Sequence, residues 1–214
     1  MYRTKEIRWF FRKEKEQIVR WFKRQNCASN RTRTDFYLDT NNEDIGIKLR
    51  AGKIEVKHRI GTRANGGLND NVWGCFDEFV KWSFNVQDQD AVLSKILDFE
   101  HCEWIPVQKN QKVLQLIEEN GVIKTKSIAE DLDYGCQVEY ATIKIYEEEW
   151  QTFALEWFGD PCLELDASII SEMMDSVELQ INESFGYASF LTKLPHDKPN
   201  KFQEKKGYFS EPIK

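Results

Sequence analysis

The sequence lacks several features that would assign it directly to a class of protein. No two cysteines are separated by two residues, no stretch of about 20 apolar residues occurs, and no glycine-rich phosphate loop precedes a helical pattern. These absences argue against a structural zinc site, a membrane-spanning helix and a P-loop nucleotide site. The cysteines are odd in number and scattered, which favours free thiols in a reducing compartment: Cys27, Cys75, Cys102, Cys136 and Cys162.

The chain also lacks a net positive charge, because its 36 Asp and Glu outnumber its 30 Lys and Arg. The 214 residues carry a formal net charge of −6, whereas a general nucleic-acid binder is basic, so we expect no DNA partner. Any anion site must therefore be a local concentration of Lys and Arg. Hydrophobic residues make up 41% of the chain, which is enough for the core of one large domain. The charged opening segment MYRTKEIRWFF has no signal-peptide pattern, so we expect a cytoplasmic protein with no membrane partner.

The first forty residues predict two strands around one helix. Positions 3–11 alternate, with Ile7, Trp9 and Phe11 on one face and Glu6, Arg8 and Phe10 on the other. The spacing of apolar residues over 13–24 predicts a short helix. The segment TDFYLDT, residues 34–40, is typical of a strand that ends in a turn.

The segment 45–60, IGIKLRAGKIEVKHRI, predicts a hairpin whose two faces differ in charge. If Ala51 and Gly52 form a two-residue loop, Arg50 lies opposite Lys53 and Lys48 lies opposite Glu55. One face of the hairpin then carries the charged side chains of Lys48, Arg50, Lys53, Glu55, Lys57 and Arg59. The other face carries Ile47, Leu49, Ile54 and Val56.

The remainder of the chain predicts further strands and two more helices. We expect a glycine-rich loop over 61–71, strands over 72–86, 104–117, 137–146 and 150–158, and helices over 89–99 and 164–184. Many strands with few helices indicate an α+β fold, with an antiparallel barrel or sandwich under helical cover. We expect one domain over 1–194 and a polar tail over 195–214, either mobile or held in place by its aromatic residues.

Three stretches of the chain resemble the CYTH family, the triphosphate tunnel metalloenzymes. Residues 6–11 (EIRWFF) stand where that family begins with alternating Glu-x-Glu-x-Lys. Residues 36–40 (FYLDT) resemble its Tyr-x-Asp-Thr strand end, which precedes basic hairpin strands similar to IGIKLR and IEVKHR. Residues 183–191 (ESFGYASFL) resemble its closing Ser-Tyr-x-x-x-Leu. The order of elements agrees across roughly residues 3–192.

The resemblance implies an eight-stranded tunnel that grips a triphosphate with Lys and Arg and holds a divalent metal with Glu. Family members hydrolyse thiamine triphosphate or inorganic triphosphate, cyclise ATP, or process RNA 5′ ends. The RNA 5′ end therefore stays among the candidate ligands. By this resemblance the phosphate-binding candidates are Arg8, Lys48, Arg50, Lys57, Arg59 and Lys109. The candidate ligands for Mg²⁺ or Mn²⁺ are Glu6, Glu139 and Glu156.

The metal-binding half of that pattern is altered in this chain. Arg8 replaces the second acid of the opening strand, and Phe10 replaces its lysine. Phe158 stands in place of the second of two alternating acids, after Glu156. An arginine cannot ligate a cation and repels one nearby, but it can pair with Glu139 or Glu156 or contact a phosphate.

The sequence therefore favours binding of a triphosphate-containing or other polyanionic small ligand, with hydrolysis weak or absent. Two alternatives stay open: an active triphosphatase that uses Mg²⁺ or Mn²⁺, and a scaffold protein whose tunnel is only architectural. A further alternative for the hairpin is that its charged face is solvated, as one side of an antiparallel sheet often is. The sequence does not determine the oligomeric state.

Overall fold

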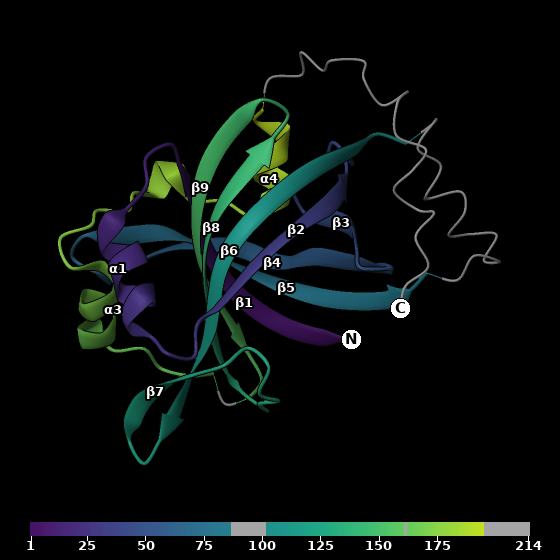
Figure 1. The fold of residues 1–214 in the computed structure, drawn as a ribbon. Coiled ribbons are helices and arrows are strands. Elements are labelled where there is room, and N and C mark those ends of the chain that lie inside the picture. The colour runs from purple at the N-terminus through teal and green to yellow at the C-terminus, as the bar shows by residue number, and fades with distance from the viewer. Residues whose placement is uncertain (87–101, 161, 195–214) are drawn as a thin grey trace.

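In the computed structural model, which describes residues 1–86, 102–160 and 162–194, eight antiparallel strands close into a barrel (Figure 1). They are β1 (Tyr2–Phe11), β2 (Ser29–Leu38), β3 (Ile45–Arg50), β4 (Lys53–Asn69), β5 (Val72–Asn85), β6 (Trp104–Glu119), β8 (Gly135–Ile145) and β9 (Glu148–Phe158). The order around the barrel is β2-β3-β4-β5-β1-β9-β8-β6, and the pairing of β2 with β6 closes it. This confirms the α+β barrel. A ninth strand, β7 (Val122–Lys126), pairs with the far end of β6.

Helices cover parts of the barrel. Helices α1 (Glu16–Arg24) and α3 (Ala167–Met174) lie side by side on one flank, whereas α4 (Tyr187–Thr192) lies elsewhere, near β8 and β9 (Figure 1). A short 3₁₀ turn, η1 (Ile181–Glu183), precedes α4. Among the described helices, none has both the length and the apolar character needed to cross a bilayer.

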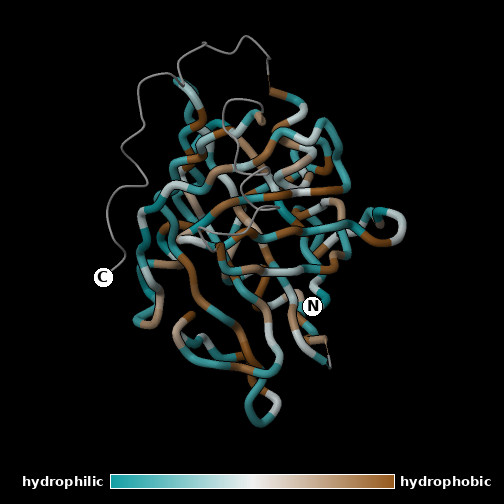
Figure 2. The backbone as a smooth tube through the Cα atoms, turned by 90° about the vertical axis from the view of Figure 1, so that its right-hand side faces the viewer, coloured by the Kyte–Doolittle hydropathy of each residue, from teal (hydrophilic) through white to brown (hydrophobic). Residues whose placement is uncertain are grey.

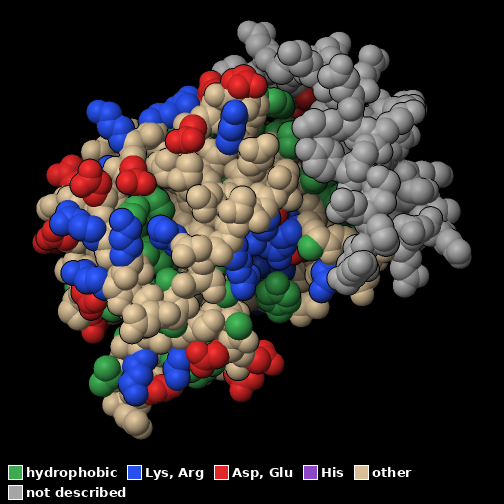
Figure 3. All heavy atoms as spheres, viewed as in Figure 1, with side chains coloured by type: hydrophobic (Ala, Val, Ile, Leu, Met, Phe, Trp, Pro, Cys, Tyr) green, Lys and Arg blue, Asp and Glu red, His purple; other side chains and the backbone are tan. Residues whose placement is uncertain are grey.

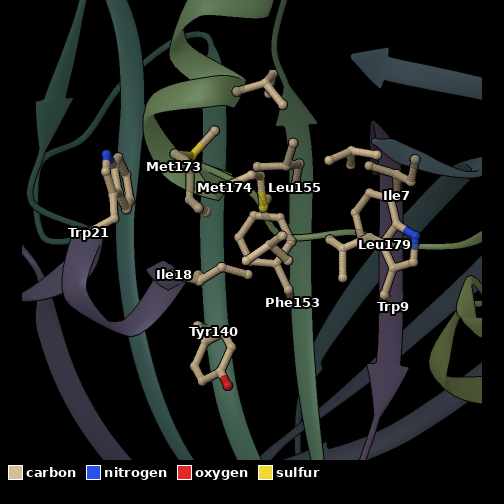
Figure 4. Close-up of a cluster of buried hydrophobic side chains, with 14 of the residues drawn as sticks. Ile7, Trp9, Ile18, Trp21, Tyr140, Phe153, Leu155, Met173, Met174 and Leu179 are labelled. Atoms are coloured by element: carbon tan, nitrogen blue, oxygen red, sulfur yellow. The ribbon is translucent and has the colours of Figure 1, made fainter. Parts of the chain in front are cut away.

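The main hydrophobic core lies outside the barrel wall, beneath α1 and α3. Trp9 on β1 and Phe153 and Leu155 on β9 are fully buried there, as are Trp21 on α1 and Met173 on α3 (Figure 4). The two tryptophans alone bury large apolar areas. Because side chains alternate along a strand, burying these residues on the outer face turns their neighbours on the same strands into the barrel.

The interior of the barrel is apolar at one end and polar over the rest. Phe10 on β1 stacks on Phe190 of α4 with ring centroids 3.9 Å apart, and inward-facing residues of β6 and β8 join this second cluster. Hydrophobic and hydrophilic residues are interleaved along the strands (Figure 2). Helix α4 and its apolar contacts therefore fill the end of the interior beside α4, and the charged residues line the remainder.

The charged face of the β3–β4 hairpin points into the barrel. The register pairs Arg50 with Lys53 and Lys48 with Glu55, as predicted, and the two turn residues Ala51 and Gly52 both have positive φ. The opposite face packs in a cluster of its own with Leu49 and Ile54 at its centre. The alternative of a solvated charged face is therefore wrong.

Two predicted elements are wrong and two lie outside the described residues. Residues 61–71 are not a loop, because β4 continues through them to Asn69 and pairs with β5. Gly66 and Gly67 are needed there because a Cβ at either position would lie 2.9 Å from the ring of Phe76 or Trp73. The helix predicted over 164–184 is only α3, which ends at Asp175 with φ of 52°. The helix predicted over 89–99 and the tail over 195–214 are not described.

Candidate functional site

The barrel encloses a cavity of about 790 Å³ to which all eight of its strands contribute lining residues. That volume is in the range of sites for small ligands. Ten of the lining side chains are Lys or Arg and six are Asp or Glu, although the whole chain is negative. Lys and Arg side chains gather near the centre of one face of the molecule, over β2 and β4 (Figure 3). The cavity is therefore a local concentration of positive charge.

The structure brings all the site residues predicted from the sequence to this one cavity. The six cationic candidates that line it are Arg8, Lys48, Arg50, Lys57, Arg59 and Lys109. The three acidic candidates that line it are Glu6, Glu139 and Glu156. Their meeting follows from the strand register, because Glu6 on β1 lies opposite Glu156 on β9, and Ala154 on β9 lies between Arg8 and Glu139.

Arg8 forms the centre of a buried ion-pair network. Its Nε donates to Glu6 Oε1 at 2.8 Å, and its Nη1 donates to Glu139 Oε1 at 2.8 Å and to Thr152 Oγ1 at 3.2 Å. The side chain reaches β8 from β1 because the residue on the strand between them is the small Ala154. Each of the three charged residues is at most 6% exposed. Their charges therefore interact with little screening by water.

The cations determine the ionisation of these acids. Burial would raise the pKa of Glu6, but Lys57 and Arg8 lower it to about 2. Burial likewise opposes ionisation of Glu139, and Arg8 and Lys109 hold its pKa below the usual value. All the carboxylates of this network are thus charged at neutral pH, and each has its positive partner within the protein.

Two lysines hold the third acidic candidate. Lys81 Nζ lies 2.8 Å from Glu156 Oε1 and Lys57 Nζ lies 3.4 Å from the same atom, while Lys57 also contacts Glu6. Despite burial, these lysines keep the pKa of Glu156 well below its usual value. Of the two carboxylates considered as partners for Arg8, the hydrogen bond is made to Glu139.

The three glutamates do not form a donor set that fits Mg²⁺ or Mn²⁺. The guanidinium of Arg8 bridges two of them and two lysines hold the third, so at least one oxygen of each carboxylate already accepts a hydrogen bond from a cation. Within residues 1–86, 102–160 and 162–194, no three His, Cys, Asp or Glu side chains are grouped so that they could hold a metal ion.

The hairpin side of the cavity has more positive charge than its acids neutralise. Lys48 and Arg50 share one carboxylate, that of Glu55, and the Lys48–Glu55 distance is 3.0 Å. Burial, followed by repulsion from Arg50, lowers the pKa of Lys48 to about 8. Arg31 and Lys53 also line the cavity, and neither forms an ion pair with any described residue. An anion that enters here meets cations that lack full compensation.

Lys109 lies in a more enclosed part of the cavity. Its Nζ lies 3.0 Å from Asp35 Oδ2, donates to the Tyr37 hydroxyl at 2.9 Å, and lies 3.9 Å from the ring centroid of Tyr187. Burial is the main cause that lowers the pKa of Lys109, and the charge of Asp35 opposes it. Asp35 in turn has its pKa lowered to about 2 by Lys109 against the effect of burial.

Arg59, like Arg8, has its charge engaged by groups of the protein itself. Its guanidinium lies 3.0 Å from Asp44 and 3.4 Å from Asp77, and it donates to the Glu43 carbonyl at 2.6 Å. These contacts tie the loop after β2 to the barrel interior. We therefore place Arg59 in the wall of the cavity.

Sequence reasoning missed several residues of the site. Asp35 and Lys81 lie in the network, and Arg31 and Arg33 add positive charge to the cavity; Lys53, predicted on the charged face of the hairpin but not among the site candidates, also lines it. Period-two alternation from Tyr37 back along β2 would have selected Asp35, Arg33 and Arg31 together. Lys81 lies directly opposite Lys57, so its place follows once β4 and β5 are paired.

Comparisons with known proteins assign no family to the chain. No family model matches it, and a search of curated proteins found no similar sequence. Among solved structures, a conserved hypothetical protein from Pyrococcus furiosus matches with a TM-score of 0.40 and 10% identity, covering 86% of this chain and 98% of that one. A protein from Pyrococcus horikoshii OT3 matches with a TM-score of 0.40 and 12% identity, covering 84% and 93%. At this level neither likeness carries an argument.

Proposed function

We propose that the chain binds a triphosphate-containing or similar polyanionic small ligand in the barrel cavity, with hydrolysis weak or absent. The observation that carries the proposal is the hairpin side of the cavity, where Lys48 and Arg50 share the single carboxylate of Glu55. Arg31 and Lys53 line the same cavity, and neither forms an ion pair with a residue that the structure describes. A ligand with several closely spaced negative charges is the complement of such a group.

The resemblance to the CYTH family supports the same class of ligand, because it places Lys48, Arg50 and Lys57 at phosphate-binding positions. Weak or absent hydrolysis follows from the acidic side of the cavity. Glu6, Glu139 and Glu156 are engaged by protein cations, so the metal that would stabilise a departing phosphoryl group has no prepared ligands. The remaining cations bind and orient a polyanion without supplying a nucleophile.

The first test is thermal melting with tripolyphosphate and with ATP, each in EDTA and in MnCl₂, together with a phosphate-release assay. A ligand at about 100 times its Kd is expected to stabilise the protein by about 2.7 kcal/mol in EDTA. The double variant Lys48→Gln/Arg50→Gln is expected to lose that stabilisation. The matched control Lys124→Gln/Lys126→Gln removes two lysines from β7, outside the cavity, and is expected to retain it.

The other outcomes of this experiment each contradict the proposal in a different way. Stabilisation that requires Mn²⁺ and is accompanied by phosphate release identifies a metal-dependent triphosphatase. The absence of any shift with either ligand identifies a cavity that is only architectural. The melting temperature of each variant without ligand is measured first, because removing Lys48 and Arg50 leaves Glu55 without a partner.

Ligand affinity is expected to fall as the pH rises through about 8. Burial and Arg50 lower the pKa of Lys48 to about 8, so its positive charge is lost above that value. A bound polyanion favours the protonated lysine, and binding near pH 8 is therefore expected to take up protons. Calorimetric titrations with sucrose octasulfate, whose charge is constant in this range, measure the effect from pH 6.5 to 9.5. Lys48→Arg is expected to remove the fall in affinity near pH 8. An unchanged dependence of affinity on pH in that variant would show that Lys48 is not its cause.

A further inference from the structure

We infer that the cavity selects the metal-free form of its polyanion, so that Mg²⁺ weakens binding by withdrawing the ligand into a complex. The inference rests on the proposed function and goes beyond it, because it names which form of the ligand the protein takes. A protein that merely has no need of a metal would bind both forms alike. The structure distinguishes these cases through the charges on the two sides of the cavity.

The acidic side of the cavity is neutralised by resident cations. Glu6 and Glu139 are bridged by Arg8 at 2.8 Å on each side, and Glu156 is held by Lys81 at 2.8 Å. Mg²⁺ requires a near-octahedral set of oxygens at short range. To ligate the oxygens that accept these bonds, a phosphate-bound Mg²⁺ would have to displace Arg8, Lys57 or Lys81 and leave a buried or half-buried cation without its partner.

A divalent ion in this space would also lie among positive charges. Arg8, Lys57 and Lys81 all point into the cavity and are buried or half-buried. Like charges repel strongly where water is largely excluded. The guanidinium of Arg8 is thus a fixed counterion for Glu6 and Glu139. Three hydrogen bonds to side chains of the barrel strands hold it in place.

On the hairpin side, the excess of positive charge favours the metal-free ligand, because that form keeps its full negative charge. Among the described residues, Lys48 and Arg50 form ion pairs only with Glu55, although the charge of Asp35 also acts on Lys48, and Arg31 and Lys53 form no ion pair there. These cations are neutralised best by a ligand that keeps all its negative charge. A triphosphate complexed by Mg²⁺ has given up two units of charge and has phosphate oxygens committed to the metal.

The experiment is a calorimetric titration of the full chain with tripolyphosphate, in EDTA and in increasing MgCl₂, with NaCl adjusted to constant ionic strength. When Mg²⁺ complexes about nine-tenths of the ligand, the apparent Kd is expected to rise about tenfold, because only the remaining fraction binds. Sucrose octasulfate serves as the control probe, since sulfate groups complex Mg²⁺ weakly, and its Kd is expected to stay unchanged.

A variant tests the part assigned to Arg8. Arg8→Glu removes the internal counterion and adds a carboxylate beside Glu6 and Glu139, so Mg²⁺ is expected to strengthen tripolyphosphate binding in this variant. If the variant does not fold, the titration of the unaltered protein still shows whether Mg²⁺ weakens binding. Binding in EDTA that Mg²⁺ leaves unchanged or strengthens overturns the inference and leaves the proposed function standing. No binding under either condition overturns both.

Discussion

Replacing Arg8 with methionine is expected to lower the free energy of unfolding by about 3–5 kcal/mol. The guanidinium hydrogen-bonds Glu6 and Glu139, and all three side chains are almost completely buried. Methionine fills similar space but leaves two carboxylates beside each other without their shared partner. The cost arises from the loss of compensating positive charge, which leaves Glu6 with Lys57 alone as its ion-pair partner, more than from the lost hydrogen bonds. Urea unfolding followed by tryptophan fluorescence measures it.

Two controls separate this effect from a general loss of charge. Arg12→Met breaks the exposed pair of Arg12 with Glu148 just beyond the same strand and is expected to cost less than about 1 kcal/mol. Adding Glu6→Gln and Glu139→Gln to Arg8→Met is expected to restore part of the lost stability, because the stranded charges are then removed. A loss below about 1 kcal/mol for Arg8→Met would show that water screens the network and would contradict its burial.

Stability is expected to fall by about 3 kcal/mol between pH 7 and pH 3 through two carboxyl groups alone. Lys57 and Arg8 lower the pKa of Glu6 to about 2 against the effect of burial, and Lys109 lowers that of Asp35 to about 2. Because the unfolded chain binds protons near pH 4, the stabilisation is complete above that pH and is lost as the pH falls toward 2.

Urea unfolding at a series of pH values measures this dependence. The Glu6→Gln variant is expected to be less stable at pH 7. Its free energy of unfolding is also expected to fall less steeply as the pH drops below 4.5, since one of the two carboxyl groups no longer titrates. Glu119→Gln is the control, because the carboxylate of Glu119 pairs with Lys126 on the exposed β7 hairpin, outside the cavity. If the free energy of unfolding of Glu6→Gln fell with pH as steeply as that of the unaltered protein, Glu6 would not be a cause of the pH dependence.

The sequence predicted the barrel well where both faces of a strand carried a clear pattern. Alternation along β1 placed Trp9 outside, with the core, and Arg8 inside, in the cavity. The β3–β4 hairpin followed from its two-residue turn, which sets the register and with it the meeting of Lys48 and Glu55. In both cases local pattern and tertiary burial select the same conformation.

Prediction failed where local signals and tertiary contacts differed. The glycines near Gly66 suggested a loop, but they leave room for the rings of Phe76 and Trp73 across a bulged strand pair. The apolar spacing over 164–184 suggested one helix, but the chain after α3 is extended. There the backbone N–H of Leu179 donates to the carbonyl of Asn71, just before β5, and the carbonyl of Leu179 accepts from the N–H of Trp73 within β5.

The ion-pair network shows why a site is harder to predict than a fold. Glu6, Arg8, Glu139 and Glu156 were candidates from the sequence, but the partners of each depend on which strands are neighbours. The contact of Arg8 with Glu139 crosses an intervening strand and requires a small residue, Ala154, at one position. The position of Lys81 in the site becomes evident only when β5 is paired with β4, which places Lys81 opposite Lys57. Such contacts are set by the closure of the barrel.

The most direct test of the central claim is a calorimetric titration of the protein with tripolyphosphate in excess EDTA. We expect saturable binding of one ligand per chain, with an affinity that falls as salt is added, and we expect Lys48→Gln/Arg50→Gln to abolish the binding. Absence of binding in EDTA, with binding restored by Mn²⁺, would contradict the account and show that the carboxylates around Arg8 rearrange to hold a metal.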